Sequence, residues 1–350
     1  MRKARFLAPG WEAGRQSGIY HCVSRVVDRQ FVLGKEEKER FVQLMRLYER
    51  FCGVRVLSHC VMSNHFHLLV EVPLRPEEGL SEREFFGRLS LLYSEMHVAE
   101  VRRLIRERKR AGDEEGVQAI VEKYLYRMWN LSEFMKTLKQ RFTQWFNKKH
   151  GRRGTLWEDR FKSVIVQDGY AARVLTAYID LNPVRAGIVK DPGKYRWCSY
   201  AEAVAGGTEA RNGIERVMSE YENLGGGVRK AKSWRQVIAD YRVILFSDGQ
   251  ERVRDSERTQ KVEVARRGVS PRQAAKVLQA GGKLSLAELL EHKVRYFVDG
   301  GVIGSRSFVD GVFNEARNRF GRTRKNGAHP MRGCEGPLFS LRDLRVRAIE

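Results

Sequence analysis

The stretch that decides the fold is Val61-Met62-Ser63-Asn64-His65-Phe66-His67-Leu68-Leu69-Val70-Glu71-Val72. Side chains alternate between the two faces of a β-strand, so His65 and His67 point to the same face. Phe66 and the apolar residues at even positions after it point to the other face, which predicts a core. Two imidazoles two residues apart can offer two nitrogens to one divalent cation. Two exposed or hydrogen-bonded histidines on a half-buried strand are the alternative interpretation.

The segments around this stretch predict an α+β fold. A tight turn at Ser63-Asn64 joins two strands into a hairpin, and apolar residues at three- and four-residue spacing predict helices before and after it. Strands are expected over 19–27, 54–62, 65–72 and 163–166, and helices over 35–51, 131–150 and 168–181, the last of them capped by Asp168. The order β-α-β-β-α-β-α predicts a ferredoxin-like antiparallel sheet with helices on one face, plus an extra helix at the end.

Two further parts of the chain differ in character from this pattern. Residues 74–127 are rich in Glu and Arg and predict an inserted helical segment with a solvated face. Beyond about residue 205, glycine pairs and triplets at 206–207 and 225–227 predict linkers, and helices are expected over 234–246, 271–279, 284–298 and 307–320. We therefore expect one domain over 1–205 and an accessory, mostly helical region over 206–350. Its helices around Gly281-Gly282 predict either a helix-turn-helix that binds DNA or a plain helical hairpin.

The charge of the chain points to a polyanionic partner. The 350 residues include 65 Lys and Arg against 43 Asp and Glu, which gives a net charge of +22. Each phosphate that a protein neutralises releases counterions and adds affinity without sequence preference. No apolar run approaches the ~20 residues of a spanning helix, so no membrane partner is expected and a cytoplasmic protein is the prediction. The five cysteines are scattered without a C-x-x-C pair, which indicates reduced thiols and leaves histidine and oxygen as metal ligands.

The predicted helix at 168–181 carries a second chemical pattern. Tyr178 and Asn182 are four residues apart, so they share a helix face about one turn from each other. A tyrosine hydroxyl is a nucleophile toward phosphorus once its proton is removed. An Asn carbonyl oxygen is an acceptable ligand for Mg²⁺ or Mn²⁺ beside two imidazoles. The alternative is that Tyr178 lies at the edge of the core and that Asn182 only ends the helix before Pro183.

A basic stretch with interleaved aromatic residues lies between these two patterns. Residues 136–162 hold nine Lys or Arg against two acids, with five Phe or Trp among them. Basic residues can follow a phosphate backbone while exposed aromatics stack on unpaired bases, which is typical of single-stranded nucleic-acid binding. A solvated helix face over a core stripe is the alternative. We expect contact with nucleic acid from Lys148, Lys149, Arg152, Arg153, Trp157, Arg160 and Lys162.

Three segments in this order resemble the single-tyrosine HUH transposases, and most of all their branch of REP-associated tyrosine transposases. They are Met62-Ser63-Asn64-His65-Phe66-His67-Leu68-Leu69-Val70, Gly154-Thr155-Leu156-Trp157-Glu158-Asp159-Arg160-Phe161-Lys162 and Ala177-Tyr178-Ile179-Asp180-Leu181-Asn182-Pro183-Val184-Arg185-Ala186-Gly187. The resemblance covers roughly residues 15–205 and excludes the insert at 74–127. Many REP-associated members open with Gly-Thr-Trp-Phe-Phe, where this chain has Gly18-Ile19-Tyr20-His21-Cys22.

The resemblance implies a chemistry and a role for each residue. His65 and His67 match the two metal-binding histidines, Asn182 the helix ligand that completes the site, and Tyr178 the nucleophile. Arg185 follows in the same motif and is expected to contact DNA. Members of the family cut single-stranded DNA near hairpins, form a 5′-phosphotyrosine link and a free 3′-hydroxyl, and rejoin ends by reversal. They use a divalent metal ion, Mg²⁺ or Mn²⁺, and no nucleotide cofactor.

Two other functions remain open from the sequence. One is a domesticated protein that binds DNA hairpins without cutting them. The other is a replication initiator or relaxase, which shares this chemistry but usually carries a cluster of three histidines. Near the pair, only His59 on the partner strand of the hairpin could be a third. Both a monomer and a dimer are compatible with the sequence.

Overall fold

The computed structural model describes residues 6–12, 14–219, 232–246, 290, 294–332 and 336–344. The chain divides into two compact units, each of which is described by itself. The N-terminal unit comprises residues 7–56 and 61–161, and the C-terminal unit comprises residues up to 6, 57–60 and 162 onward. The helix predicted at 271–279 and most of the one predicted at 284–298 lie outside the described residues.

The N-terminal unit is built on the hairpin that the His-Phe-His stretch predicts. Strands β1 (Gly18–Arg25) and β3 (His65–Val72) pair antiparallel in continuous register, from Gly18 opposite Val72 to Arg25 opposite His65. Strand β2 (Arg55–Val61) leads into β3, and the backbone amide of Met62 donates to His65 O across the turn. The element order and the antiparallel strands confirm the predicted α+β class.

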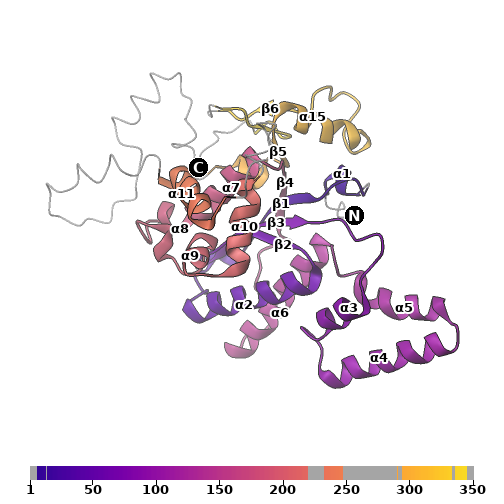
Figure 1. Ribbon diagram of the computed structural model, residues 1–350. Helices are drawn as coiled ribbons and strands as arrows, with labels where there is room; N and C mark the ends of the chain where they lie inside the picture. The colour runs from indigo at the N-terminus through magenta and orange to yellow at the C-terminus, as the bar shows by residue number, and fades with distance from the viewer. Residues whose placement is uncertain are drawn as a thin grey trace, which may run out of the picture. The chain divides into compact units, whose positions relative to one another are not determined.

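Two helices cover the apolar face of β3. Helices α2 (Lys35–Cys52) and α6 (Leu131–Lys149) lie side by side in Figure 1. The ring of Phe41 on α2 lies 4.5 Å from Phe66 on β3 and 5.3 Å from Phe142 on α6, measured between centroids. Phe66, Phe41 and Phe142 are fully buried. The even-numbered face of β3 is therefore the core face, as the alternation of the strand predicts.

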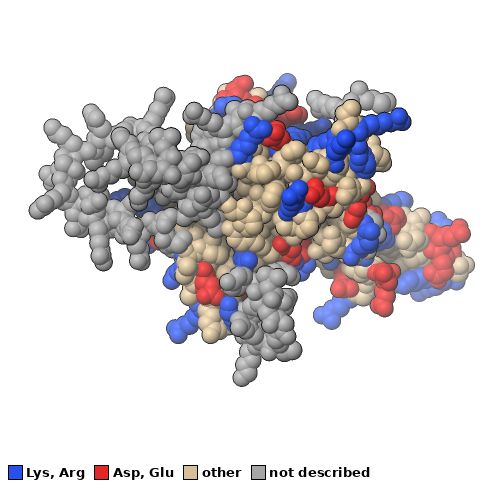
Figure 2. All heavy atoms as spheres, turned by 90° about the horizontal axis from the view of Figure 1, so that it is seen from above, with Lys and Arg blue, Asp and Glu red and all other residues tan. Residues whose placement is uncertain are grey.

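The predicted insert is helical. It contains α3 (Glu82–Leu89), α4 (Glu95–Arg110) and α5 (Glu114–Leu125), which begin at the side-chain caps Ser81, Ser94 and Asp113. Several of its charges pair with each other, for example Arg103 with Glu100 and Glu107. Figure 2 shows blue and red side chains intermixed over the insert, at the right of the view. Part of the charge of this segment is thus balanced by ion pairs within the segment.

The C-terminal unit carries the helix that contains Tyr178. Its elements are, in order, β4 (Lys162–Val166), α7 (Tyr170–Asp180), α8 (Asn182–Arg185), α9 (Ser199–Val204), α10 (Thr208–Ser219), α11 (Trp234–Phe246), α14 (Tyr296–Asp299), β5 (Val302–Gly304), α15 (Arg306–Glu315), β6 (His329–Pro330) and β7 (Phe339–Ser340). Strand β5 pairs parallel with β4 and antiparallel with β7, and β7 pairs with β6. These three short strands were not predicted, because two or three residues are too few to show a period of two.

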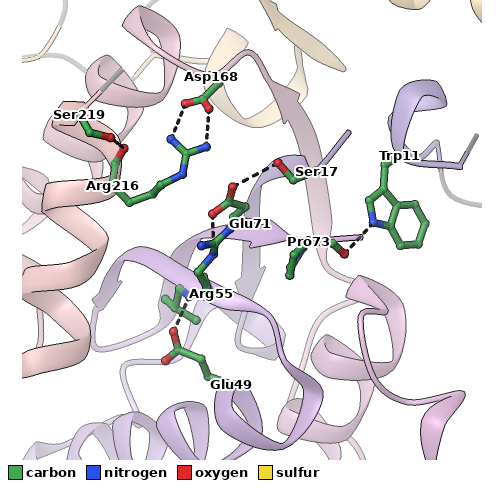
Figure 3. Close-up of polar contacts among 10 residues, drawn as sticks. Trp11, Ser17, Glu49, Arg55, Glu71, Pro73, Asp168, Arg216 and Ser219 are labelled. Atoms are coloured by element: carbon green, nitrogen blue, oxygen red, sulfur yellow. Dashed lines mark hydrogen bonds and ion pairs between the residues drawn. The ribbon is translucent and has the colours of Figure 1, made fainter. Parts of the chain in front are cut away.

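The start of α7 differs from the prediction. The N-cap is Gly169, at φ 79°, and it makes no side-chain cap, so the predicted cap by Asp168 is wrong. Asp168 instead forms an ion pair with Arg216 on α10, at 2.5 Å (Figure 3). This pair ties the beginning of the tyrosine helix to α10. None of the described helices combines the length and apolar content that crossing a bilayer requires.

A glycine on α10 tests how closely this helix approaches the backbone at Leu57. A Cβ on Gly213 would lie 2.5 Å from Leu57 O, so we expect Gly213→Ala to destabilise the protein by about 1–3 kcal/mol through overpacking. The matched control is Gly87→Ala on α3, where nothing lies within 4 Å of the added Cβ. The control should gain up to about 1 kcal/mol from helix propensity. Urea denaturation of both variants measures the difference, and equal stabilities would contradict the close approach.

Candidate active site

Three histidines lie on the face of the β1–β3 ladder opposite the phenylalanine core. His21 on β1 and His67 on β3 share a hydrogen bond of 2.9 Å between Nε2 of His21 and Nδ1 of His67. Their rings stack at 5.1 Å between centroids with an interplanar angle of 16°. The ring of His65 lies 5.1 Å from that of His67 at 80°. His21 and His67 are buried, and His65 is partly exposed.

The hydrogen bonds of this cluster suit a pair of metal ligands. Nδ1 of His65 lies 2.6 Å from Oδ1 of Asn64, and Nδ1 of His67 is held by His21. Metal-binding histidines are commonly oriented in this way, with one ring nitrogen held by a second group and the other directed to the metal. The donor set therefore fits two ligands of a divalent cation. Within the described part of the chain, no group of three or more His, Cys, Asp or Glu is placed to hold a metal by itself.

His21 is a residue that reasoning from the sequence missed. It lies outside the His-x-His motif and reaches His67 only through strand pairing, in which Val23 stands opposite His67 and His21 opposite Leu69. Residues opposite each other share a face, so this register places His21 diagonally beside His67. The sequence did offer one signal, a histidine in the first predicted strand. It does not reveal the register with which that strand pairs with β3.

A second polar group continues the same face of β3. Glu71 is buried, and its carboxylate lies 2.8 Å from Nε of Arg55 and accepts a hydrogen bond from Ser17 Oγ at 3.2 Å. Figure 3 shows these three side chains converging. The charge of Glu71 is thereby balanced, which makes it a structural group of this face.

Tyr178 lies in the C-terminal unit and is buried, with 1% of its surface exposed. The guanidinium carbon of Arg185 lies 3.9 Å from the centre of the tyrosine ring, and Nη2 of Arg185 donates to Tyr178 O at 2.6 Å. The ring of Phe297 on α14 meets the tyrosine edge-on at 4.9 Å. Burial lowers the pKa of Arg185, partly opposed by the nearby Tyr178. Arg185 and α14 together cover the tyrosine.

Asn182 lies one turn beyond Tyr178, as predicted. Its amide nitrogen donates to Ile179 O at 3.2 Å and to Tyr178 O at 3.5 Å. These bonds engage the amide nitrogen, and Oδ1 is the side-chain atom of Asn182 that could act as a metal ligand. Because the histidines and the tyrosine helix belong to different units, the structure describes the two halves of the predicted site separately.

The lysines and arginines of 148–162 that are predicted to contact DNA fall into two groups. Lys148, Arg153 and Arg160 are exposed, and Arg152 is half-buried over the ring of Phe146 at 5.7 Å. Lys149 and Lys162 already form ion pairs, Lys149 with Glu36 and Glu37 and Lys162 with Asp299.

Trp157 belongs to the core. It is 6% exposed, its ring lies 5.3 Å from Phe66, and its Nε1 donates to Lys139 O at 3.3 Å. The indole is therefore not displayed for stacking on bases, which corrects the expectation from the sequence. The alternation of basic and aromatic residues does not say which rings face inward.

The Glu37 ion pair predicts a pH dependence. Burial raises the pKa of Glu37, but hydrogen bonds from Lys149, the backbone and His150 outweigh it, so that the net pKa is lowered from 4.5. The ionised Glu37 therefore stabilises the folded protein at pH values above the pKa that Glu37 has in the unfolded chain. This stabilisation is lost as the pH falls through the lower pKa that Glu37 has in the folded protein. Glu37→Gln should cost about 1–3 kcal/mol at pH 7 and progressively less below pH 4.5.

Thermal denaturation between pH 3 and pH 7 measures this loss. Glu36→Gln is the matched control, since Glu36 contacts the same lysine nitrogen but its side chain is 69% exposed, so its loss should cost less. A Glu37→Gln penalty that is independent of pH would contradict the ion pair.

One family model matches the segment that contains the histidine motif. Residues 15–83 match the family model described as "Transposase IS200 like", a segment that contains His21, His65 and His67. No curated protein matches the chain. A solved structure described as "Structure of the REP associates tyrosine transposase bound to a REP hairpin" is similar with 14% identity and a TM-score of 0.36, covering 59% of this chain and 86% of that chain. Residues 15–83 of this chain are therefore similar to the IS200-like transposases.

Proposed function

We propose that this protein is a metal-dependent endonuclease and strand transferase that cuts and rejoins single-stranded DNA near hairpins, as in transposition. The observation that carries the proposal is the histidine cluster of β1 and β3, within the segment that matches the IS200-like transposases. A net charge of +22 suits a DNA partner. Residues 1–205 would form the catalytic domain, residues 206–350 an accessory region, and the protein would act in the cytoplasm on nucleoid DNA.

Tyr178 is the proposed nucleophile. Its phenolic oxygen attacks a backbone phosphorus, and the new O–P bond forms as the bond from phosphorus to the 3′-oxygen breaks. The phenol loses its proton to solvent, and the departing oxygen takes one to become a 3′-hydroxyl. Reversal by a 3′-hydroxyl restores a phosphodiester, so no external energy source is needed. Because Tyr178 is buried beneath Arg185 and Phe297, these side chains must separate from the ring when DNA enters.

His65, His67 and Asn182 are the proposed ligands of Mg²⁺ or Mn²⁺. A bound cation supplies charge that stabilises the phosphate oxygens during displacement. His21 and Asn64 hold the two imidazoles in orientation through their Nδ1 atoms. The exposed Lys148, Arg153 and Arg160, with Arg152, are proposed to contact the phosphate backbone, and Lys149, Lys162 and Arg185 would do so on exchanging their present partners.

Loss of the tyrosine hydroxyl tests the nucleophile. We expect Tyr178→Phe to remove the covalent protein–DNA adduct while leaving folding and hairpin binding intact, since only one oxygen is lost. Incubation with a labelled hairpin oligonucleotide, denaturing electrophoresis and peptide mass mapping detect the adduct. Tyr170→Phe, on the same helix and 37% exposed, is the control and should still form it. An adduct that persists in Tyr178→Phe would refute the assignment, and its absence from the wild type would favour a non-catalytic hairpin-binding protein.

Loss of the histidines tests the metal site. His65→Ala/His67→Ala should abolish both Mn²⁺ binding, measured by electron paramagnetic resonance, and metal-dependent cleavage, with little effect on salt-dependent DNA affinity. His97→Ala/His329→Ala is the control pair and should bind Mn²⁺ normally. His21→Phe should weaken Mn²⁺ affinity about 10–100-fold, as the loss of an orienting group does. Unchanged affinity in the His65/His67 variant would exclude this site.

A further inference from the structure

A small polar cavity lies beside helix α15 in the C-terminal unit, outside the segment that matches the transposase family. Its volume is about 240 Å³. The lining includes Arg306, Asp310, Phe313, Asn314, Lys325 and Asn326. We propose that this cavity binds one nucleotide of single-stranded DNA, held by its phosphate and read by the two amides.

Hydrogen bonds and close packing fix the shape of the cavity. Arg306, Asp310 and Asn314 are spaced by four residues along α15, so they line one face of the helix. Oδ1 of Asp310 accepts hydrogen bonds from the backbone amides of Gly327 and Ala328, at 3.2 and 2.7 Å, which fastens the facing loop to the helix. A Cβ on Gly327 would lie 2.4 Å from Cβ of Phe313, so only glycine allows this approach.

The segment formed by α15 and the loop that closes the cavity is strongly basic. Residues 306–325 contain six Arg or Lys and two acids. Two of the arginines hold the loop together: Arg317 donates to Phe320 O and Gly321 O, and Arg324 donates to Asn326 O and Gly327 O. Both guanidinium groups also lie over the ring of Phe313, at 5.3 and 5.2 Å. Arg322 and Lys325 are exposed on the loop so formed.

The chemistry of the lining selects the class of ligand. Arg306 and Lys325 provide two cationic groups, which suit a phosphate. Asn314 and Asn326 provide amide donors and acceptors, which suit the edge of an unpaired base. A metal cation is disfavoured, because the one carboxylate, Asp310, is engaged by backbone amides and lies 3.8 Å from Arg306. The polar lining disfavours an apolar ligand.

The cavity is joined to the tyrosine helix through β-structure within the same unit. Strand β5 pairs with β4, the strand that leads into α7. The backbone amide of Ser305 donates to Oε1 of Gln167 at 2.6 Å, and Ser305 Oγ caps α15 by accepting from Phe308 N at 3.3 Å. A nucleotide held here would be anchored to the framework that carries Tyr178. The single-stranded segment that flanks the cut is therefore the proposed ligand, which rests on the proposed function.

The test compares a hairpin with a single-stranded tail and the same hairpin without it. The pocket variant is Arg306→Ala/Lys325→Ala in the full chain, and the matched control is Arg83→Ala/Lys123→Ala, which removes two exposed cations from the insert. Fluorescence anisotropy should show a loss of about tenfold in affinity for the tailed hairpin and a log–log salt slope smaller by about 1–2. The control variant should bind both hairpins with unchanged affinity. The pocket variant should bind the hairpin without a tail with unchanged affinity. Photocrosslinking from a 4-thiothymidine tail should map to residues 306–328.

Each other outcome overturns the inference. Equal losses for the tailed and blunt hairpins would make the pocket a duplex contact, and an unchanged affinity would exclude DNA from it. Competition by inorganic phosphate or by dTMP alone at the affinity of the tail would indicate a small-anion site instead. Tighter binding of an RNA tail would assign the pocket to RNA. Because these readouts measure binding and crosslinking, they are independent of the Tyr178 adduct that tests the proposed function.

Discussion

The antiparallel register of β1 and β3 is the constraint on which the N-terminal unit depends. Alternation along β3 sends Phe66 into the core formed with Phe41 and Phe142, and sends His65 and His67 to the opposite face. A slip of one residue would exchange the two faces and move imidazoles into the core. The same register brings His21 to Nδ1 of His67. Packing of the aromatic core thus holds the orientation of the histidines.

The basic residues of this chain divide into those held by contacts within the protein and those exposed on its surface. Many basic residues are bound within the protein: Arg103 pairs with glutamates of the insert, Lys149 with Glu36 and Glu37, and Arg324 with backbone carbonyls of its loop. The total of 65 Lys and Arg therefore overstates the number of cations available to a polyanion. The exposed remainder, including Arg153, Arg160 and Lys325, is where contact with phosphate is proposed.

The burial of Tyr178 connects the proposed chemistry to the C-terminal residues of the chain. Phe297 and Arg185 cover the ring, and Arg185 also donates to Leu290 O at 3.0 Å. Residues beyond 290 are thus part of the surroundings of the tyrosine helix, through α14 and through β5 beside β4. The functional division of the chain at residue 205 remains a prediction. The packing does not change at that residue, because the residues on both sides of it belong to the same compact unit.

The sequence by itself determined the α+β order of elements, the hairpin at Ser63-Asn64 and the inward and outward faces of β3, because these follow from local periodicity and turn chemistry. It also indicated His65, His67, Tyr178 and Asn182 as candidates by spacing within one element. Only the tertiary structure decided that His21 contacts His67, that Trp157 is buried, and that two- and three-residue strands near the C-terminus extend from β4. Those features depend on pairing between segments distant in the chain, which local periodicity does not encode.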